Sequence, residues 1–226
     1  MKVKKIMDSI KSSQNKRDHD IYAKVAPSIF ACDFTDLLNS IQKVEKSGCR
    51  YLHLDIMDGH FVPNISFGPK ISAEILDKTV LLGDVHLMIE NPLFFLDMFN
   101  HKNVQFITVH FESFIEEEKK LIEIIDKIHS LGKKAGVSIK PATDVKILIP
   151  YLELFDLVLV MTVEPGFSGQ KMIESALDKI DKLSNKRASK GYSFLIEVDG
   201  GVNFENASSL IERGADLLVM GSAFFK

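Results

Sequence analysis

The sequence has 226 residues, of which 46% are hydrophobic and 26% are charged, and 28 basic against 31 acidic side chains give a formal charge of −3. This apolar content excludes a disordered chain, and the negative charge argues against a nucleic-acid binder that relies on a basic surface. No apolar run approaches the roughly 20 residues of a membrane-spanning helix, so no membrane contact is expected. A chain of this length suits one α/β barrel or two small domains.

The first 23 residues differ from the rest of the sequence. They are polar, carry six Lys or Arg side chains, and contain no apolar stretch of the kind that a signal peptide needs. We therefore predict a polar N-terminal extension over residues 1–23 and a single barrel domain over residues 24–226. The two cysteines, Cys32 and Cys49, are too few for a disulfide framework, which favours buried thiols and a cytoplasmic location.

From Lys24 onward, short apolar runs alternate with amphipathic stretches. The apolar runs predict strands at residues 25–30, 51–56, 80–89, 104–110, 135–139, 157–162, 194–198 and 217–220. The amphipathic stretches predict helices at residues 36–46, 69–78, 92–100, 116–131, 144–152, 174–189 and 204–213. Local signals support these boundaries: Gly48 follows the first helix, Pro92 opens the third, and Thr143 or Asp144 can cap the fifth.

The pattern as a whole predicts a (β/α)8 TIM barrel. Continuous Val, Ile and Leu runs are typical of parallel strands that are buried on both faces, and strand–helix alternation indicates parallel crossovers. An open doubly wound sheet is the alternative, but the GxGxxG dinucleotide fingerprint is absent. The sequence ends at Lys226, directly after the eighth strand, so we expect the eighth helix to be missing or truncated.

Polar side chains occur where most of the predicted strands end, which is where barrels carry their chemistry. The strand ends are Ser28, His53-Leu54-Asp55, His86-Leu87-Met88, His110-Phe111-Glu112, Lys140-Pro141, Met161, Glu197-Val198-Asp199 and Gly221-Ser222. Because alternate residues of a strand share a face, His53 and Asp55 both point into the barrel, where His86 and Asp199 can join them. Two imidazoles and two carboxylates suit one divalent ion such as Zn²⁺, Fe²⁺, Mn²⁺ or Co²⁺.

Glycine-rich loops follow the last three strands and predict a second subsite. The loops contain Gly166-Phe167-Ser168-Gly169, Gly200-Gly201 and Gly221-Ser222. Loops after strands seven and eight commonly bind phosphate in barrels, and glycine lets backbone N–H groups approach the anion. Taken singly, each glycine motif would be an ordinary turn, but three adjacent loops favour a phosphate site that needs no basic cluster.

Three methionines, Met57, Met88 and Met161, lie at or just past strand ends. They are either flexible core residues or an uncharged, polarisable wall beside a reactive centre.

A metal, a phosphate site and carboxylates from distant strands together suggest an epimerisation. A metal that chelates a ketose carbonyl and the neighbouring hydroxyl would acidify the C–H group between them and stabilise an enediolate. One of Asp55 and Asp199 would remove that proton, and the other would return one on the opposite face.

Several motifs make the sequence from about Val25 to Phe225 resemble the ribulose-phosphate 3-epimerase family. They are Ala26-Pro27-Ser28-Ile29 with Asp33-Phe34; His53 to Asn64 (HLDIMDGHFVPN); Asp84-Val85-His86-Leu87-Met88; Met161 to Gln170 (MTVEPGFSGQ); Glu197 to Val202 (EVDGGV); and Gly221-Ser222-Ala223. The resemblance implies a metal-dependent isomerase of the pentose phosphate pathway that interconverts D-ribulose 5-phosphate and D-xylulose 5-phosphate. It also implies a homo-oligomer.

The resemblance also implies roles for individual residues. Asp55 is implied as the proton acceptor and Asp199 as the donor, with these roles exchanged in the reverse direction. The implied metal ligands are His53, Asp55, His86 and Asp199; the substrate contacts are Ser28 and His86, with Met57, Met88 and Met161 lining the enediolate; and the phosphate contacts are Gly166, Phe167, Ser168, Gly169, Gly200, Gly201, Gly221 and Ser222. The loop from Asp58 to Asn64 is expected beside the site.

Two departures and three alternatives accompany this resemblance. Ser168 stands where many members have glycine. The short C-terminus has two explanations: the first 23 residues could cover the gap left by the eighth helix, or the sequence is a truncated gene product.

The first alternative is an epimerase for another phosphorylated ketose, such as allulose 6-phosphate. The second is a sugar-phosphate decarboxylase, which favours an Asp/Lys network that only Lys140 would fit. The third is a barrel without catalytic activity, which would bind no metal.

Overall fold

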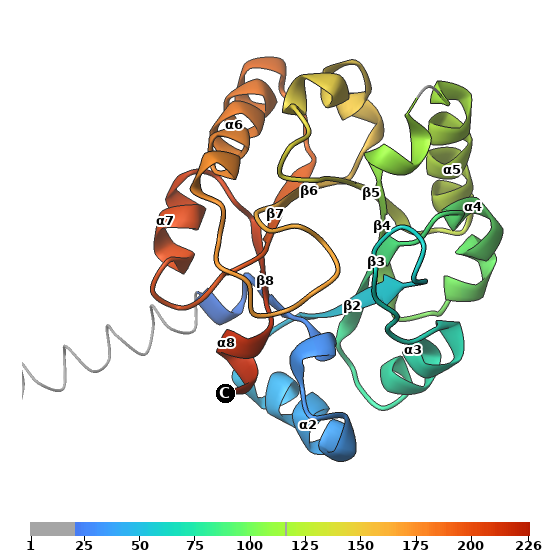
Figure 1. Cartoon of the computed structure of the whole chain (residues 1–226), viewed down its shortest axis with the longest axis vertical. Helices are drawn as coiled ribbons and strands as arrows, with labels where there is room; N and C mark the ends of the chain where they lie inside the picture. Colours follow the sequence, from blue (N-terminus) through green and yellow to red (C-terminus); the bar gives the residue numbers. More distant parts are fainter. Residues whose placement is uncertain (1–20, 116) are drawn as a thin grey trace, which may run out of the picture.

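The computed structural model describes residues 21–115 and 117–226, and within them eight strands form a parallel sheet that curls into a barrel (Figure 1). Most of residues 1–23, the predicted extension, lies outside the described residues. The strands are β1 (Val25–Pro27), β2 (Tyr51–Met57), β3 (Leu82–Met88), β4 (Val104–His110), β5 (Lys134–Ile139), β6 (Leu157–Met161), β7 (Leu195–Asp199) and β8 (Leu217–Met220). The predicted TIM barrel is confirmed.

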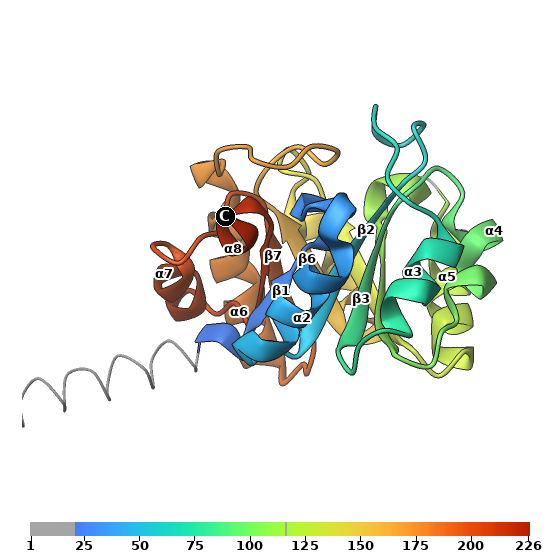
Figure 2. The same ribbon diagram turned by 90° about the horizontal axis from the view of Figure 1, so that it is seen from below.

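Helices surround the barrel on its outer side, as Figures 1 and 2 show. The α-helices are α2 (Leu37–Ser47), α3 (Pro69–Leu76), α4 (Pro92–Phe95), α5 (Glu118–Ser130), α6 (Asp178–Lys190), α7 (Ala207–Glu212) and α8 (Ser222–Phe225). Shorter 3₁₀ helices lie at Ile29–Ala31, Phe34–Asp36, Leu96–Phe99, Phe111–Phe114 and Glu174–Ala176, and a longer one at Val145–Leu154. None of the helices in the described part of the chain is long and apolar enough to cross a membrane.

The strands pair in the order β1-β8-β7-β6-β5-β4-β3-β2, each with parallel neighbours. The junction between β1 and β2 closes the ring, and in the described part of the chain it consists of one isolated parallel bridge between Ser28 and His53. The pairing of β2 with β3 is much longer and runs from Tyr51 and Leu82 to Met57 and Met88. The barrel is therefore joined firmly on most of its circumference and lightly at one seam.

Two hydrophobic layers stabilise this arrangement. The larger layer lies between the strands and the helices; α5 contributes Leu121, Ile124, Ile125 and Ile128, the face that its sequence predicts. The smaller layer lies inside the barrel and includes Tyr51, Phe106, Leu157, Leu159 and Leu217, several of which begin their strands. Because apolar side chains fill the interior at the amino ends of the strands, the polar side chains are restricted to its middle and its carboxyl end.

Several predicted boundaries were wrong for local reasons. The first strand ends at Pro27 rather than at residue 30, because the backbone turns into a 3₁₀ helix at Ile29. The fifth helix is a 3₁₀ helix that continues to Leu154, and Pro150 inside it has no N–H group to donate. The predicted Asp144 cap is confirmed, since its side chain accepts a hydrogen bond from the Lys146 N–H group.

The predicted truncation of the eighth helix is confirmed, because α8 has four residues. It lies in the outer ring between α7 and α2 (Figure 1). Phe224 of α8 is buried, and its ring packs against Tyr22, which also contacts Phe204. The end of the predicted N-terminal extension thus covers part of the gap beside α8.

Both cysteines are free thiols; Cys49 is buried as expected, whereas Cys32 is only partly buried.

Candidate active site at the carboxyl ends of the strands

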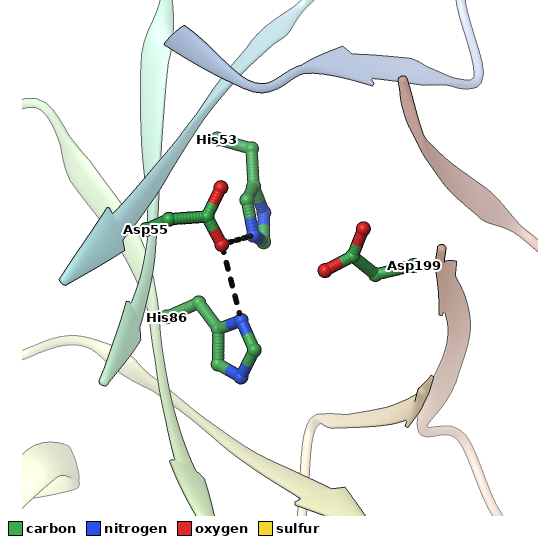
Figure 3. Close-up of side chains that lie close together, drawn as sticks. All are labelled: His53, Asp55, His86 and Asp199. Atoms are coloured by element: carbon green, nitrogen blue, oxygen red, sulfur yellow. Dashed lines mark ion pairs between the residues drawn. The ribbon is translucent and has the colours of Figure 1, made fainter. Parts of the chain in front are cut away.

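Four ionisable side chains converge inside the barrel near its carboxyl end (Figure 3). His53 and Asp55 come from β2, His86 comes from β3, and Asp199 ends β7 on the other side of the opening. The parallel register places Asp55 beside His86, and the two-residue spacing on β2 directs His53 and Asp55 to the same face. One nitrogen or oxygen atom from each of the four lies within 4.8 Å of the corresponding atoms of the others.

The two histidines present free nitrogen atoms to the same carboxylate oxygen. His53 Nε2 lies 3.3 Å and His86 Nδ1 lies 3.5 Å from Asp55 Oδ1. Neither nitrogen has a hydrogen-bond partner among the described residues, although both rings are fully buried. Buried polar atoms without a partner are costly, so these two nitrogens fit the role of ligands to a cation.

The donor set fits a divalent metal ion. Two imidazole nitrogens and two carboxylates suit the borderline ions Zn²⁺, Fe²⁺, Mn²⁺ and Co²⁺. The other nitrogen of His53, Nδ1, lies 2.6 Å from Asp84 Oδ2, which is the carboxylate support that metal-bound histidines commonly have. The residues present are therefore compatible with a metal that His53, Asp55, His86 and Asp199 would hold.

The two carboxylates have opposite electrostatic surroundings. Burial, and after it the negative charge of Asp55, raise the pKa of Asp199 to about 7. Burial acts in the same direction on Asp55, but the adjacent His53 and His86 rings outweigh it and hold the pKa of Asp55 below its ordinary value. Asp55 is thus a carboxylate near neutral pH, while Asp199 can carry a proton.

A cavity of about 210 Å³ opens above these groups. Its walls include most of the residues that the sequence predicts for the site: Ser28, Asp55, Met57, Met88, Met161, Gly166, Phe167, Ser168, Gly169, Asp199, Gly200, Gly201, Gly221 and Ser222. His53 and His86 do not line the cavity, because they lie fully buried behind it. The predicted contact between His86 and a substrate stays a prediction; His86 Nδ1 lies 3.5 Å from Asp55 Oδ1 behind the wall.

The charges that line the cavity are only negative. Among the described residues in its walls, the charged side chains are Asp55 and Asp199. One rim of the cavity consists of the three glycine-containing loops, in which Gly166, Gly169, Gly200 and Gly201 have positive φ angles. An anion in this cavity would have to be bound by backbone N–H groups and a bound cation rather than by lysine or arginine.

Two hydrogen bonds hold the surroundings of the cavity in place. The Asn64 side-chain amide donates a hydrogen bond of 2.6 Å to the Gly166 carbonyl oxygen, which ties the Asp58–Asn64 loop to the cavity-lining loop after β6. Ser28 Oγ donates a 2.5 Å hydrogen bond to Asp55 Oδ2. This bond fixes the orientation of the Asp55 carboxylate toward the two histidines.

The sequence prediction gave no role to several buried polar residues around the site. Asp84 and Glu197 are fully buried two residues before His86 and Asp199, and His110 is fully buried at the end of β4. The sequence did indicate that these residues face inward. Each lies two positions from another polar side chain in a mostly apolar strand, as His53 and Asp55 do. Burial and the nearby Asp84 charge raise the pKa of Glu197 well above its ordinary value, which favours a protonated Glu197 beneath the site.

Lys140, the lysine that a decarboxylase-like network would use, does not line the cavity. Its ammonium group lies over the Phe61 ring, 4.1 Å from the ring centre. The structure therefore does not form the Asp/Lys network of that alternative at the cavity.

Comparison with known proteins identifies the fold and the family. A solved tryptophan synthase α-subunit variant from Pyrococcus furiosus matches 89% of this chain and 88% of its own with a TM-score of 0.65, but at 17% sequence identity it shows only a common barrel fold. The residues 24–225 match the model of the "Ribulose-phosphate 3 epimerase family". Ribulose-phosphate 3-epimerases from Bacillus subtilis and Treponema pallidum are 47% and 42% identical to this chain, over 89% of its length and 92% and 90% of theirs.

The fold and the site define an α/β-barrel enzyme with acidic and imidazole groups at the mouth of the barrel. The chain belongs to the ribulose-phosphate 3-epimerase family, and it is an isomerase of the epimerase class.

Proposed function

We propose that this enzyme interconverts D-ribulose 5-phosphate and D-xylulose 5-phosphate by moving the C3 proton between two carboxylates. The observation that carries the proposal is the placement of Asp55 and Asp199, which come from β2 and β7 and face each other across one cavity. Inverting a carbon centre requires a proton to leave one face and another to arrive on the opposite face. Two carboxylates on opposite walls supply both positions.

Asp55 would accept the proton from C3 of ribulose 5-phosphate, and Asp199 would donate one to the other face. In the metal-free protein the pKa of Asp55 lies below its ordinary value and that of Asp199 is raised to about 7, so the two carboxylates differ in their affinity for a proton. The hydrogen bond from Ser28 holds the Asp55 carboxylate in place during this transfer. In the reverse direction the two carboxylates exchange roles.

His53, Asp55, His86 and Asp199 would hold one divalent ion. When bound, such an ion polarises the C2 carbonyl and acidifies the neighbouring C–H group. A charge argument supports its presence, since a sugar phosphate entering this cavity would otherwise meet the negative charge of Asp55 and no Lys or Arg among the described residues of its walls. Zinc, iron, manganese and cobalt all suit the donor set, and the choice among them depends on supply.

The phosphate group would bind to the loops that contain Gly166–Gly169, Gly200–Gly201 and Gly221–Ser222. These loops lie together at one rim of the cavity, where backbone N–H groups can approach an anion closely. Part of the remaining wall is formed by Met57, Met88 and Met161. Their uncharged thioether groups exchange no proton with an enediolate beside them.

A turnover assay with ribulose 5-phosphate tests the proposal. We expect xylulose 5-phosphate to form, activity to disappear after the protein is treated with a chelator, and activity to return on addition of Zn²⁺, Fe²⁺, Mn²⁺ or Co²⁺. Allulose 6-phosphate, assayed in parallel, should react far more slowly. Faster turnover of allulose 6-phosphate would assign a different substrate, and no turnover or metal uptake would leave a barrel without this activity.

The family resemblance also leads us to propose a homo-oligomer that works in the cytoplasm. Light scattering on the purified protein measures its mass in solution and tests the oligomer. If the protein at micromolar concentration has the mass of a single 226-residue chain, it is a monomer, and the proposal of a homo-oligomer is contradicted.

A further inference from the structure

A series of hydrogen bonds runs from His86 away from the cavity toward the surface. His86 Nε2 lies 2.9 Å from His110 Nε2, and His110 Nδ1 lies 3.1 Å from Glu112 Oε2. The second oxygen, Glu112 Oε1, accepts hydrogen bonds from the Lys140 N–H group at 2.7 Å and from the Thr143 hydroxyl. His86 and His110 are fully buried, so water cannot replace these partners.

Counting the hydrogen atoms gives each ring nitrogen a defined state. The backbone N–H group of Lys140 can only donate, and Glu112 is an acceptor whose pKa is held at about 2 despite burial, above all by the hydrogen bond from His110. His110 Nδ1 therefore carries the hydrogen atom that it donates to Glu112. If His86 Nδ1 binds a metal, it carries no hydrogen, and the hydrogen atom of His86 must be on Nε2. His110 Nε2 is then the acceptor of that hydrogen bond.

Ring packing holds this arrangement in place. The rings of His86 and His110 lie edge to edge, with their centres 4.9 Å apart and an angle of 27° between the planes, which suits a hydrogen bond between the two Nε2 atoms. Phe61 lies against His110 with a centre distance of 4.6 Å, and the Lys140 ammonium group lies over the Phe61 ring. His110 thus has little freedom to rotate away from His86.

We propose that His110 and Glu112 are positioning residues that keep the hydrogen atom of His86 on Nε2 and present His86 Nδ1 to the metal. This inference rests on the proposed function, because it requires a metal at His86. Hydrogen-bond partners of metal-bound histidines fix the ring orientation and increase the basicity of the ligand nitrogen. Asp84 has the equivalent position at His53, where it lies on Nδ1 and leaves Nε2 for the metal.

Zn²⁺ affinity tests the proposal without relying on turnover. Metal-free protein is titrated with Zn²⁺ in competition with a chelator of known affinity. His110→Phe keeps an aromatic ring but removes the acceptor, so we expect Zn²⁺ binding to weaken by roughly 10–100-fold. His110→Gln, which can place an amide oxygen near the former Nε2 position, should restore most of this loss. Glu112→Gln should give an intermediate loss, since an amide cannot accept hydrogen bonds on both of its sides.

Thr108→Val provides the matched control. Thr108 is a fully buried residue of the same strand, two positions before His110, and within the described part of the chain its hydroxyl has no hydrogen-bond partner. Its replacement should leave Zn²⁺ affinity within about twofold of the parent protein. Thermal unfolding of all variants, without metal, shows whether each is folded. A folded His110→Phe protein with unchanged affinity would overturn the proposal.

The tautomer itself is measured by long-range ¹H–¹⁵N correlation spectra of the histidine rings in the zinc-loaded protein. We expect the metal on Nδ1 and the hydrogen atom on Nε2 of His86, with this pattern lost or broadened in His110→Phe. A metal on Nε2 of His86 would overturn the proposal. If the parent protein binds no Zn²⁺ at all, the proposed metal-dependent function fails instead, so the two failures are distinguishable.

Discussion

Asp199 has two proposed roles, as the proton donor and as one of the four metal ligands, so its replacement has to be read together with the metal content of the variant. Asp199→Asn removes the group proposed to donate the proton and leaves a side chain of the same shape. We expect conversion of ribulose 5-phosphate to fall by roughly 10²–10⁴-fold, because general acid–base groups contribute factors of that size. Conversion by isolated, folded protein is the measurement, with metal content determined on the same sample.

Asp97→Asn is a suitable control, because Asp97 is an exposed carboxylate on the outer ring that pairs with Lys127. This variant should keep full activity. Near-normal conversion by Asp199→Asn would remove Asp199 from the proposed chemistry.

Glu112 makes the stability of the protein depend on pH. Its pKa in the folded protein is about 2 and lies below the ordinary value of 4.5, with the hydrogen bond from His110 as the largest favourable cause against the effect of burial. The contribution of ionised Glu112 to the free energy of unfolding is therefore complete above about pH 4.5 and is lost as the pH falls toward 2. This contribution is at most about 3 kcal/mol.

Urea unfolding of the parent protein and Glu112→Gln at pH 6 and pH 3 measures this effect. We expect the parent protein to be the more stable at pH 6 and the difference between the two to shrink by about 1–2 kcal/mol at pH 3. Glu74→Gln, at an exposed site on α3, should show no such change. A difference that is constant across this range would mean that Glu112 is not held ionised by its neighbours.

The turn after β7 is the element that depends most strongly on glycine. Gly200 has a φ angle of +122°, and a Cβ atom there would lie 2.7 Å from the Val163 backbone nitrogen. Gly169 also has a positive φ, +77°, but a Cβ atom there would meet nothing within 4 Å. Both positions strain any other residue, but only Gly200 would also force the backbone of the neighbouring loop to move.

Gly200→Ala and Gly169→Ala therefore form a matched pair. We expect Gly169→Ala to lower the free energy of unfolding by about 1 kcal/mol and Gly200→Ala by about 3 kcal/mol or more. The KM for ribulose 5-phosphate should also rise more in Gly200→Ala, because the displaced turn belongs to the proposed phosphate rim. Equal losses in the two variants would show that strain in φ, rather than crowding against Val163, dominates.

Much of the barrel and of the site could be predicted from the sequence, because strand periodicity determines which side chains face inward. His53 and Asp55 illustrate this, since their two-residue spacing alone puts both inside the barrel. The fifth helix could not be predicted as a 3₁₀ helix, because Val145–Leu154 has an amphipathic pattern that both helix types satisfy. The roles of His110 and Glu112 depend on contacts between β3, β4 and the following loop, which no local spacing encodes.

At the scale of the whole molecule, the ring of strands is joined unevenly. β1 pairs with β8 through three residues, and it meets β2 through the bridge between Ser28 and His53, whereas β2 and β3 pair along seven residues each. Both residues of that bridge belong to the candidate site. The weakest joint of the ring therefore lies directly beside the proposed metal ligands.

This seam has a consequence for the motions of the protein. Local opening between β1 and β2 separates Ser28 from Asp55 and tilts His53, so an opened barrel would bind an ion poorly. A bound ion favours the closed form by its difference in affinity for the two forms. Amide hydrogens of β1 and of the adjoining part of β2 should exchange with solvent faster than those of β3 and β4, and loading with Zn²⁺ should slow exchange there first. The cation would thus link β2 and β3 with β7, which lies on the other side of this seam in the strand order.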